Sequence, residues 1–214
     1  MQVIPAINEI SFSAVREKVR ILAQFLEAGS FIHIDVVDGV FAPNVTWDDI
    51  EEFKELRREF PNFKFEIHLM VQNPESAVAA WCMAGVSRVV VHLETMTDPA
   101  LIRKQAEQSG SEVVLAITVP TEAESLVAHA GDFKMFQILG VFPGMAGQKF
   151  KHEALAKITY LRKKVPHAII EVDGGMDEET VKLVKNAGAD LVVVSSYIFS
   201  SEHPEQAYKV LTEI

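Results

Sequence analysis

The hydrophobic and polar positions of this chain follow two periods in turn. Short runs that are apolar almost throughout, such as the one at residues 31–37, indicate strands that are buried on both faces. Between these runs, apolar residues recur at the three- and four-residue spacing of amphipathic helices. The predicted strands span residues 3–7, 31–37, 65–71, 88–93, 113–119, 135–141, 168–172 and 191–194.

The predicted helices begin and end at residues that favour such boundaries. Val15, Val19 and Leu22 lie on one face of a helix predicted over residues 13–28, and we expect Gly29 to cap its end. We expect Thr46 to open the second helix, because Asp49 follows three residues later. The other predicted helices span residues 74–84, 99–108, a short stretch after 121, 152–164, 178–186 and 204–211.

Eight strands that alternate with eight helices predict a parallel sheet covered by helices. Because the chain has 214 residues, near the lower size limit of this fold, we expect a single (β/α)8 TIM barrel domain over residues 1–214. The alternative is an open, doubly wound sheet. It is disfavoured because the glycines form no dinucleotide-binding fingerprint after the first strand.

Composition and charge narrow the range of partners and compartments. The formal net charge of −10 disfavours nucleic acid and an anionic membrane surface as partners, although local backbone dipoles can still hold a small phosphate. No apolar run approaches the roughly 18 residues of a membrane-spanning helix, and the first residues lack the pattern of a secretion signal. Because Cys82 is the only cysteine, no internal disulfide forms, and we expect a cytoplasmic protein.

Two ionisable residues interrupt the apolar strand at residues 31–37. His33 and Asp35 are two positions apart, so their side chains emerge from the same face of the strand. Burying such a pair is unfavourable unless something compensates it. A divalent cation would do so, because imidazole and carboxylate are both ordinary metal ligands. A core histidine that is hydrogen-bonded to its neighbour is the alternative that this stretch alone leaves open.

Two further polar residues fall at the ends of predicted strands, where TIM barrels carry their active sites. His68 lies in the third strand and Asp173 ends the seventh. With His33 and Asp35 they make four metal ligands with room for substrate oxygens. We expect Asp35 and Asp173 to flank a small planar substrate, so that one removes a proton and the other returns one on the opposite face. A bound cation would stabilise the enediolate between these steps.

The loops after the last three strands are rich in small residues. The segment PGMAGQKF at residues 143–150 follows the sixth strand, Gly174 and Gly175 follow the seventh, and Ser195 and Ser196 follow the eighth. Glycines let backbone N–H groups approach an anion, and the loops after strands seven and eight of this barrel often bind phosphate. Tight strand-to-helix turns are the alternative for any one of these loops.

Four segments, in this order, closely resemble the signatures of the ribulose-phosphate 3-epimerase family: HIDVVDGVFAPN, EIHLMVQNPE, VFPGMAGQKF and IIEVDGG. The likeness runs from about residue 31 to residue 199. It implies a metal-dependent 1,1-proton transfer that inverts carbon 3 of a ketose phosphate, from D-ribulose 5-phosphate to D-xylulose 5-phosphate. It also implies one divalent metal ion (zinc, iron or manganese) and a homo-oligomer.

The resemblance assigns roles to individual residues. It makes His33, Asp35, His68 and Asp173 the metal ligands, and Asp35 and Asp173 the acid/base pair. The phosphate is expected at Gly144, Ala146, Gly147, Gly174, Gly175, Ser195 and Ser196.

Three residues are expected around the sugar: Glu9, Met70 and Phe142. Glu9 stands where the family has a substrate-contacting serine, or Asn8 does if the register slips by one. Phe142 replaces an asparagine, and further departures from the family pattern are Val37, Ala146 and Ser195. Core packing is the equal alternative for Met70.

These departures leave the substrate open while the metal ligands are retained. D-allulose 6-phosphate is therefore an alternative substrate, and a non-catalytic sugar-phosphate-binding paralogue is an alternative function. A decarboxylase on the same barrel is disfavoured, because such enzymes show an Asp-x-Lys-x-x-Asp strand and the matching strand here has no lysine. His92, which ends the fourth predicted strand, is interpreted as a core histidine rather than a substrate contact.

Overall fold

Eight parallel strands pair in sequence order and close into a barrel in the computed structural model, which describes residues 1–214. The predicted (β/α)8 TIM barrel is confirmed. The strands are β1 (Gln2–Ile7), β2 (Phe31–Val37), β3 (Lys64–Met70), β4 (Arg88–His92), β5 (Glu112–Ile117), β6 (Met135–Leu139), β7 (Ile169–Asp173) and β8 (Leu191–Val194). The helices are α1 (Phe12–Leu22), α2 (Ile50–Glu59), α3 (Pro74–Ala84), α4 (Pro99–Ser109), α5 (Glu124–Val127), α6 (Glu153–Lys164), α7 (Glu178–Ala187), α8 (Ser196–Phe199) and α9 (Pro204–Thr212).

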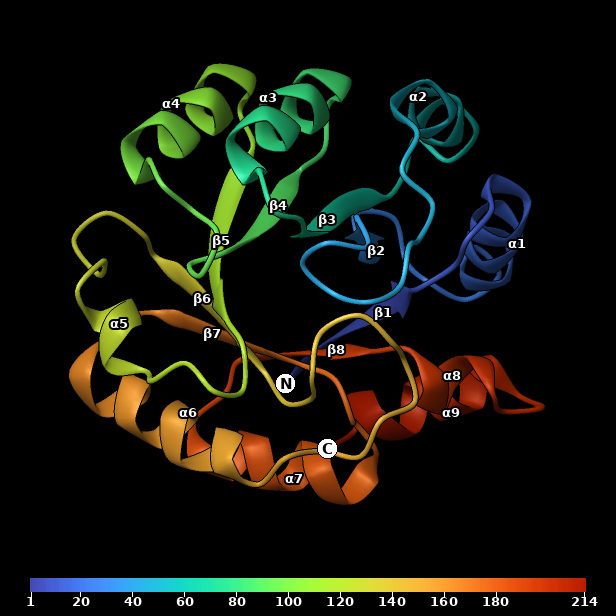
Figure 1. Ribbon diagram of the computed structural model, residues 1–214. Coiled ribbons are helices and arrows are strands. Elements are labelled where there is room, and N and C mark those ends of the chain that lie inside the picture. The colour runs from blue at the N-terminus through green and yellow to red at the C-terminus, as the bar shows by residue number, and fades with distance from the viewer. The chain divides into compact units, whose positions relative to one another are not determined.

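Two compact units make up the chain. The N-terminal unit comprises Ala6–Val113, and the C-terminal unit comprises Met1–Pro5 together with Val114–Ile214. Within the N-terminal unit, α1 to α4 lie on one side of β2, β3 and β4 (Figure 1). Within the C-terminal unit, α5 to α9 likewise lie to one side of β6, β7 and β8 (Figure 1).

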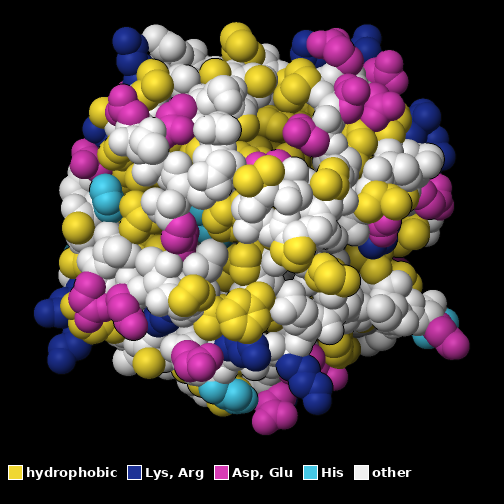
Figure 2. Space-filling view, in the orientation of Figure 1, with side chains coloured by type: hydrophobic (Ala, Val, Ile, Leu, Met, Phe, Trp, Pro, Cys, Tyr) yellow, Lys and Arg dark blue, Asp and Glu magenta, His cyan; other side chains and the backbone are white.

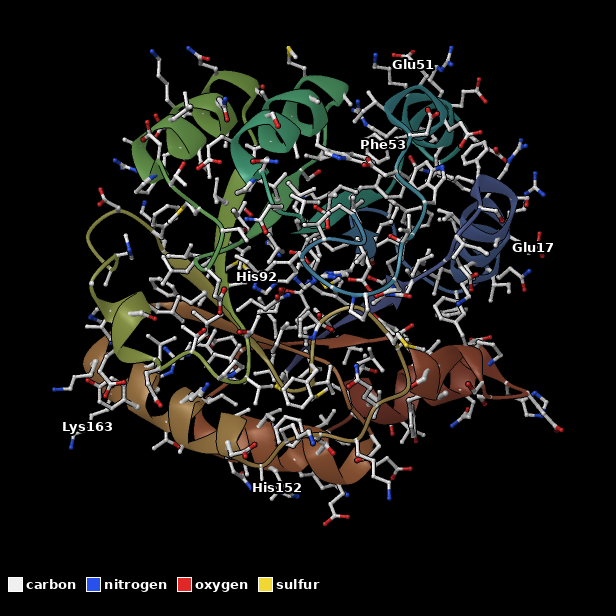
Figure 3. The ribbon with its side chains drawn as sticks, in the orientation of Figure 1. Glu17, Glu51, Phe53, His92, His152 and Lys163 are labelled. Carbon is white, nitrogen blue, oxygen red and sulfur yellow. The ribbon has the colours of Figure 1, made fainter.

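The core of the N-terminal unit is built on the pairing of β2 with β3. These strands are in register from the pair of Phe31 and Lys64 to the pair of Val37 and Met70. Phe53 points from α2 toward this sheet (Figure 3), where its ring centroid lies 5.5 Å from that of Phe65. Burial of one such large apolar side chain contributes roughly 1.5–3 kcal/mol to the stability of the fold. The β2–β3 pair is therefore a stable base for the polar residues that it carries.

The C-terminal unit has a core of its own. Phe136, Ile170 and Val192, on three neighbouring strands, are fully buried. Lys157 of α6 is also buried, and its ammonium group donates to the backbone carbonyls of Thr118, Val119 and Thr121. This lysine therefore ties α6 to the loop that follows β5.

The first two helices differ from their predicted bounds. Helix α2 begins at Ile50 rather than Thr46, because the Thr46 hydroxyl is occupied by β2: it donates to the Asp35 carbonyl and accepts from the Val37 N–H. Asp49 caps the helix instead, through the N–H groups of Glu51 and Glu52.

Helix α1 ends earlier than predicted, at Leu22 rather than Ala28. The next N–H groups, those of Gln24 and Phe25, bond to carbonyls three residues back, so the helix tightens and stops before Gly29. The short helix α8 was not among the predicted elements.

On the face in Figure 2, Lys and Arg side chains are interspersed with Asp and Glu rather than gathered in one basic patch. Apolar side chains also reach the surface, and in the N-terminal unit they include Ile10, Val40 and Val45. Measured against the length and apolar character that crossing a bilayer requires, every helix of the fold falls short.

Candidate metal centre and active site

His33 and Asp35 project from the same face of β2, as their spacing predicts. His33 is fully buried, whereas the Asp35 side chain keeps 12% of its surface exposed. The His33 Nε2 atom lies 3.1 Å from Asp35 Oδ1. Of the two residues, only Asp35 is therefore accessible to a small molecule.

His68 reaches the same carboxylate from the neighbouring strand. It stands directly opposite Asp35 in the β2–β3 register, and its Nδ1 atom lies 3.3 Å from Asp35 Oδ1. The rings of His33 and His68 meet edge to face, with their centroids 5.2 Å apart. The structure thus brings together three of the four predicted metal ligands within the N-terminal unit.

The donor atoms of this cluster suit a divalent cation. Ligand atoms of His33, Asp35 and His68 lie within 4.8 Å of one another. Two imidazoles and a carboxylate are ligands that zinc, iron and manganese all accept. The cluster could therefore bind a metal, and the same ligands do not specify which one.

Hydrogen bonds explain why His33 needs such compensation. Its Nδ1 atom is 2.7 Å from Glu66 Oε1, while its Nε2 atom faces Asp35, so both nitrogens meet a carboxylate. A neutral imidazole has only one N–H. Burial alone would lower the pKa of His33, but the bonds to Asp35 and Glu66 outweigh it and raise the pKa well above its ordinary value. Either a second proton or a cation satisfies this geometry.

The same contacts keep Asp35 ionised. Burial alone would raise its pKa, but hydrogen bonds from His33 and His68 outweigh burial and hold the pKa of Asp35 far below its ordinary value. Its other oxygen, Oδ2, accepts a hydrogen bond of 2.8 Å from the Asn8 side chain. An ionised carboxylate that is fixed at both oxygens can accept a proton in a defined direction.

Two residues after β1, Asn8 and Glu9, were both candidates for the substrate-contacting position of the family, and they have different partners in the structure. Asn8 contacts Asp35, whereas the Glu9 carboxylate lies 2.7 Å from Lys18 of α1. Glu9 is thus engaged by a helix next to its own strand, and Asn8 is the residue of this pair that faces the cluster.

Apolar residues lie next to the cluster at the end of β2. Met70, which stands opposite Val37 in the register, is buried in a group with Val37 and Ala42, and Phe41 packs against this group. The Phe41 ring in turn lies 4.7 Å from the ring of His92. Met70 is therefore part of a packed apolar group.

His92 has more contacts than a simple core histidine. It is fully buried, and its label in Figure 3 marks its position at the end of β4. Its Nε2 atom lies 2.8 Å from Nε2 of His68, and its Nδ1 atom lies 3.3 Å from a carboxylate oxygen of Glu94. His92 thus contacts a candidate ligand directly, which sequence analysis did not anticipate.

Glu66 was also missed as a site residue. It precedes His68 by two positions and so emerges from the same face of β3, which is the one sequence signal that marks it. In the structure its carboxylate is fully buried between His33 and Arg88, at 2.7 and 2.8 Å. Burial alone would raise the pKa of Glu66, and the bonds to His33 and Arg88 hold it below its ordinary value.

The remaining candidate residues lie in the C-terminal unit. Asp173 is the last residue of β7, where it pairs with Leu139 of β6 and Val193 of β8. Its carbonyl accepts a 2.7 Å bond from the N–H of Gly140, which fixes the backbone at this strand end. Asp173 is only partly buried.

The predicted phosphate loops contain backbone conformations that favour glycine. Gly144, Gly147, Gly174 and Gly175 all have positive φ angles. At Gly175 a side chain is excluded on a second ground, because a Cβ atom would lie 2.5 Å from the backbone nitrogen of Phe150. Two of the predicted loops are therefore in direct contact through their backbones.

A cavity of about 660 Å³ adjoins these loops. Of the predicted phosphate residues, Gly147, Gly175 and Ser196 line it, one from each of the three loops. Lys149 also lines the cavity and supplies a positive charge, and the acidic residues Asp177 and Glu179 line it as well. Phe142 is half exposed, and the Lys151 ammonium lies 5.2 Å from the centre of its ring.

Sequence comparison connects this chain to one family. Residues 2–199 match the model of the ribulose-phosphate 3 epimerase family. A ribulose-phosphate 3-epimerase of Candida glabrata is 32% identical over 198 residues, which cover 86% of this chain and 80% of that protein. A ribulose-phosphate 3-epimerase of Bacillus subtilis is 30% identical over 217 residues, which cover 97% of this chain and 96% of that protein.

Structural comparison supports the fold. A 3-hexulose-6-phosphate synthase from Salmonella typhimurium superposes with a TM-score of 0.77 over 100% of this chain and 97% of that one, at 18% sequence identity. A 3-keto-L-gulonate-6-phosphate decarboxylase from Vibrio cholerae superposes with a TM-score of 0.74 over 99% and 95% of the two chains, at 13% identity. These similarities show a shared barrel fold and no more.

Proposed function

This chain belongs to the ribulose-phosphate 3-epimerase family and is an isomerase, and on that premise we propose that it inverts carbon 3 of D-ribulose 5-phosphate through a metal-dependent, two-base proton transfer. The observation that carries the proposal is the convergence of His33, Asp35 and His68 on β2 and β3. A histidine, a carboxylate and a second histidine on adjacent strands are more than core packing needs.

The metal ligands in this proposal are His33 through Nε2, His68 through Nδ1, and the carboxylates of Asp35 and Asp173. The first three are supported by their mutual distances. When bound, a divalent cation would polarise the ketone oxygen and offset the negative charge that develops in the enediolate.

Asp35 acts as one of the two bases. Its low pKa keeps it ionised at neutral pH, and its partial exposure lets it reach a substrate. It removes the proton from carbon 3, and the electron pair of the C–H bond becomes part of the enediolate. Asn8 holds the carboxylate in place during this step through its hydrogen bond to Oδ2.

Asp173 is the proposed partner on the opposite face of the substrate. In this direction of the reaction Asp173 begins protonated and donates that proton to carbon 3 of the enediolate, which restores the ketone with inverted configuration and leaves Asp173 ionised. Its support is its place as the last residue of β7, since the strand ends of this fold carry the active site, together with the family membership of the chain.

The phosphate of the substrate is assigned to the three small-residue loops of the C-terminal unit. The 660 Å³ cavity supports this role, because Gly147, Gly175 and Ser196 line it together with Lys149. The assignment of the other four residues rests on family membership alone, because they do not line this cavity: Gly144, Ala146, Gly174 and Ser195.

The function is tested by isotope exchange. Purified protein is loaded with zinc, iron(II) or manganese, mixed with D-ribulose 5-phosphate in heavy water, and followed by NMR and mass spectrometry. We expect deuterium on carbon 3 and formation of D-xylulose 5-phosphate. Absence of both with every metal would exclude this substrate.

A second ketose phosphate is the alternative if that result is negative. Phe142 stands at a position where the family has an asparagine, and it is half exposed beside Lys151. Such a change alters the surroundings of the sugar without touching the metal ligands. D-Allulose 6-phosphate in the same exchange assay distinguishes a changed substrate from a lost activity. A homo-oligomer remains the expectation, and light scattering of the purified protein tests it.

A further inference from the structure

Each histidine of the candidate metal centre is hydrogen-bonded by a side chain from the next strand. His33 on β2 contacts Glu66 on β3, and His68 on β3 contacts His92 on β4. In both cases the contact uses the ring nitrogen that does not face Asp35. The same arrangement therefore occurs twice across three strands: a histidine faces the centre, and a side chain of the next strand holds that histidine by a hydrogen bond.

The contact between His33 and Glu66 fixes the proton of His33. Because a carboxylate only accepts, the 2.7 Å contact requires that the His33 Nδ1 atom carries hydrogen. Nε2 is then the nitrogen that a cation at the centre would take, in place of the second proton. Arg88 donates to the second oxygen of Glu66 at 2.8 Å, so the carboxylate is held at both ends and is fully buried.

A second chain of bonds does the same for His68. The Glu94 carboxylate lies 3.3 Å from His92 Nδ1, so this nitrogen carries hydrogen and the His92 Nε2 atom is left as an acceptor. It accepts from His68 Nε2–H at 2.8 Å, so Nδ1 is the His68 nitrogen that a cation at the centre would take. The rings of His68 and His92 stack, with their planes 19° apart, and Phe41 packs against His92.

We propose that Glu66 and His92 are positioning residues that select the metal-binding nitrogen of each histidine, Nε2 in His33 and Nδ1 in His68. The inference rests on the metal dependence proposed above and goes beyond it, because it concerns residues that touch neither metal nor substrate. Outer hydrogen-bond partners of this kind fix ring orientation, and their loss commonly weakens metal binding 10- to 100-fold.

The test measures cobalt(II) binding without substrate. Glu66→Leu and His92→Phe remove the acceptor and keep apolar bulk or ring stacking. Glu66→Gln and His92→Gln keep an oxygen acceptor. Affinity is measured by competition with a chromogenic chelator, and the visible absorption of bound cobalt(II) reports the ligand geometry. We expect roughly 10- to 100-fold weaker binding and an altered spectrum for the first two variants, and less than about 10-fold for the glutamine variants.

The matched control is Phe53→Leu, which disturbs a fully buried core residue of α2 and leaves Glu66, His92 and their hydrogen-bond partners unchanged. It should lower thermal stability without changing the cobalt(II) affinity or spectrum. Unchanged affinity and spectrum in Glu66→Leu and His92→Phe would overturn the proposal and leave these residues with a purely structural role. If the unaltered protein binds no divalent cation, the metal dependence itself fails, which is a distinct result. The glutamine variants keep the test decisive if the apolar ones do not fold. Each keeps an oxygen acceptor, so a loss of about 10-fold or more in cobalt(II) affinity in both of them would also count against the proposal.

Discussion

The amide nitrogen of Asn8 lies 2.8 Å from Oδ2 of Asp35 and donates a hydrogen bond to it. This contact joins the loop after β1 to the residue proposed to remove the substrate proton. A hydrogen bond to a charged group contributes about 1.5–3 kcal/mol. The Asn8–Asp35 contact is therefore strong enough to affect catalysis measurably.

We expect Asn8→Leu to lower kcat/KM for the ketose phosphate by about 10- to 100-fold, since Asp35 loses the donor that orients it. Steady-state kinetics at saturating metal measure the effect. Glu9→Gln is the control, because Glu9 pairs with Lys18 away from the cluster, and its activity should stay within about 3-fold. A larger loss in Glu9→Gln than in Asn8→Leu would contradict the assignment.

The two-base mechanism predicts a specific defect when one base is removed. Replacing Asp173 with Asn should reduce epimerisation by about 10²- to 10⁴-fold, because no acid remains on one face. Exchange of the carbon-3 proton with heavy water should persist in only one of the two epimers, through Asp35. Metal content is measured in parallel to separate lost ligation from lost proton transfer. Equal exchange from both epimers would argue for a single base.

A glycine can be required by a positive φ angle or by a lack of space for a side chain, and a comparison of Gly175 with Gly110 distinguishes the two causes. Their φ angles are nearly the same, +73° and +72°, but a Cβ atom at Gly175 would meet Phe150, whereas nothing lies within 4 Å at Gly110. Gly110→Ala should cost only the strain of the left-handed backbone, about 1–2 kcal/mol. Gly175→Ala should lower the free energy of unfolding by a further ~1–3 kcal/mol, and it should raise KM for the phosphorylated substrate. Urea denaturation and kinetics check both, and equal losses would show that the contact with Phe150 is easily relieved.

Arg88 compensates the buried charge of Glu66. Its guanidinium group lies 2.8 Å from Glu66 and 3.0 Å from Glu112. Arg88→Met leaves Glu66 buried without this partner, so we expect the free energy of unfolding to fall by about 3–5 kcal/mol. Adding Glu66→Gln to Arg88→Met should recover part of that loss in urea denaturation. If the double variant is no more stable than Arg88→Met, the charge of Glu66 is not the source of the loss.

Asp177 links stability to pH through the N-terminus of α7. It accepts from the N–H and the hydroxyl of Thr180, both at 2.8 Å, and the backbone bond in particular holds the pKa of Asp177 below its ordinary value. The carboxylate therefore contributes stability that is present above about pH 3.9 and is lost as the pH falls through the lower folded pKa. Asp177→Ala should cost about 1 kcal/mol at pH 7 and less in acid.

Asp177→Asn is the matched control for this prediction, because an amide caps a helix without titrating in this range. The free energy of unfolding is measured by denaturation at pH 7 and at pH 3. The difference in this free energy between Asp177→Ala and Asp177→Asn should be the same at both pH values. The difference between Asp177→Ala and the unaltered protein should be smaller at pH 3. If the difference in free energy of unfolding between Asp177→Ala and the unaltered protein is the same at pH 3 as at pH 7, Asp177 is not the titrating group.

The sequence predicted what depends on local periodicity and on spacing within one strand. The alternation of strands and helices predicted the barrel, and the two-residue spacing of His33 and Asp35 predicted a shared face, because both follow from short-range geometry. The start of α2 was wrong, since Thr46 has the residue type of a helix cap but its hydroxyl bonds to β2.

The supporting roles of Glu66 and His92 could not be predicted, because they depend on how neighbouring strands are aligned. Glu66 stands opposite His33 only in the register that the β2–β3 pairing adopts. The sequence marks the face from which Glu66 emerges, but not the residue it meets. The choice between Asn8 and Glu9 likewise needed the position of Lys18 on α1.

The aromatic core of the N-terminal unit determines what an optical experiment can observe. The chain has two tryptophans, Trp47 and Trp81, and their ring centroids lie 6.1 Å apart in this unit. Intrinsic tryptophan emission therefore originates entirely from residues within Ala6–Val113 and carries no direct signal from the glycine-rich loops of the other half. An unfolding curve followed by fluorescence alone would miss an independent unfolding of that half, whereas circular dichroism, which samples the helices of both halves, would register it.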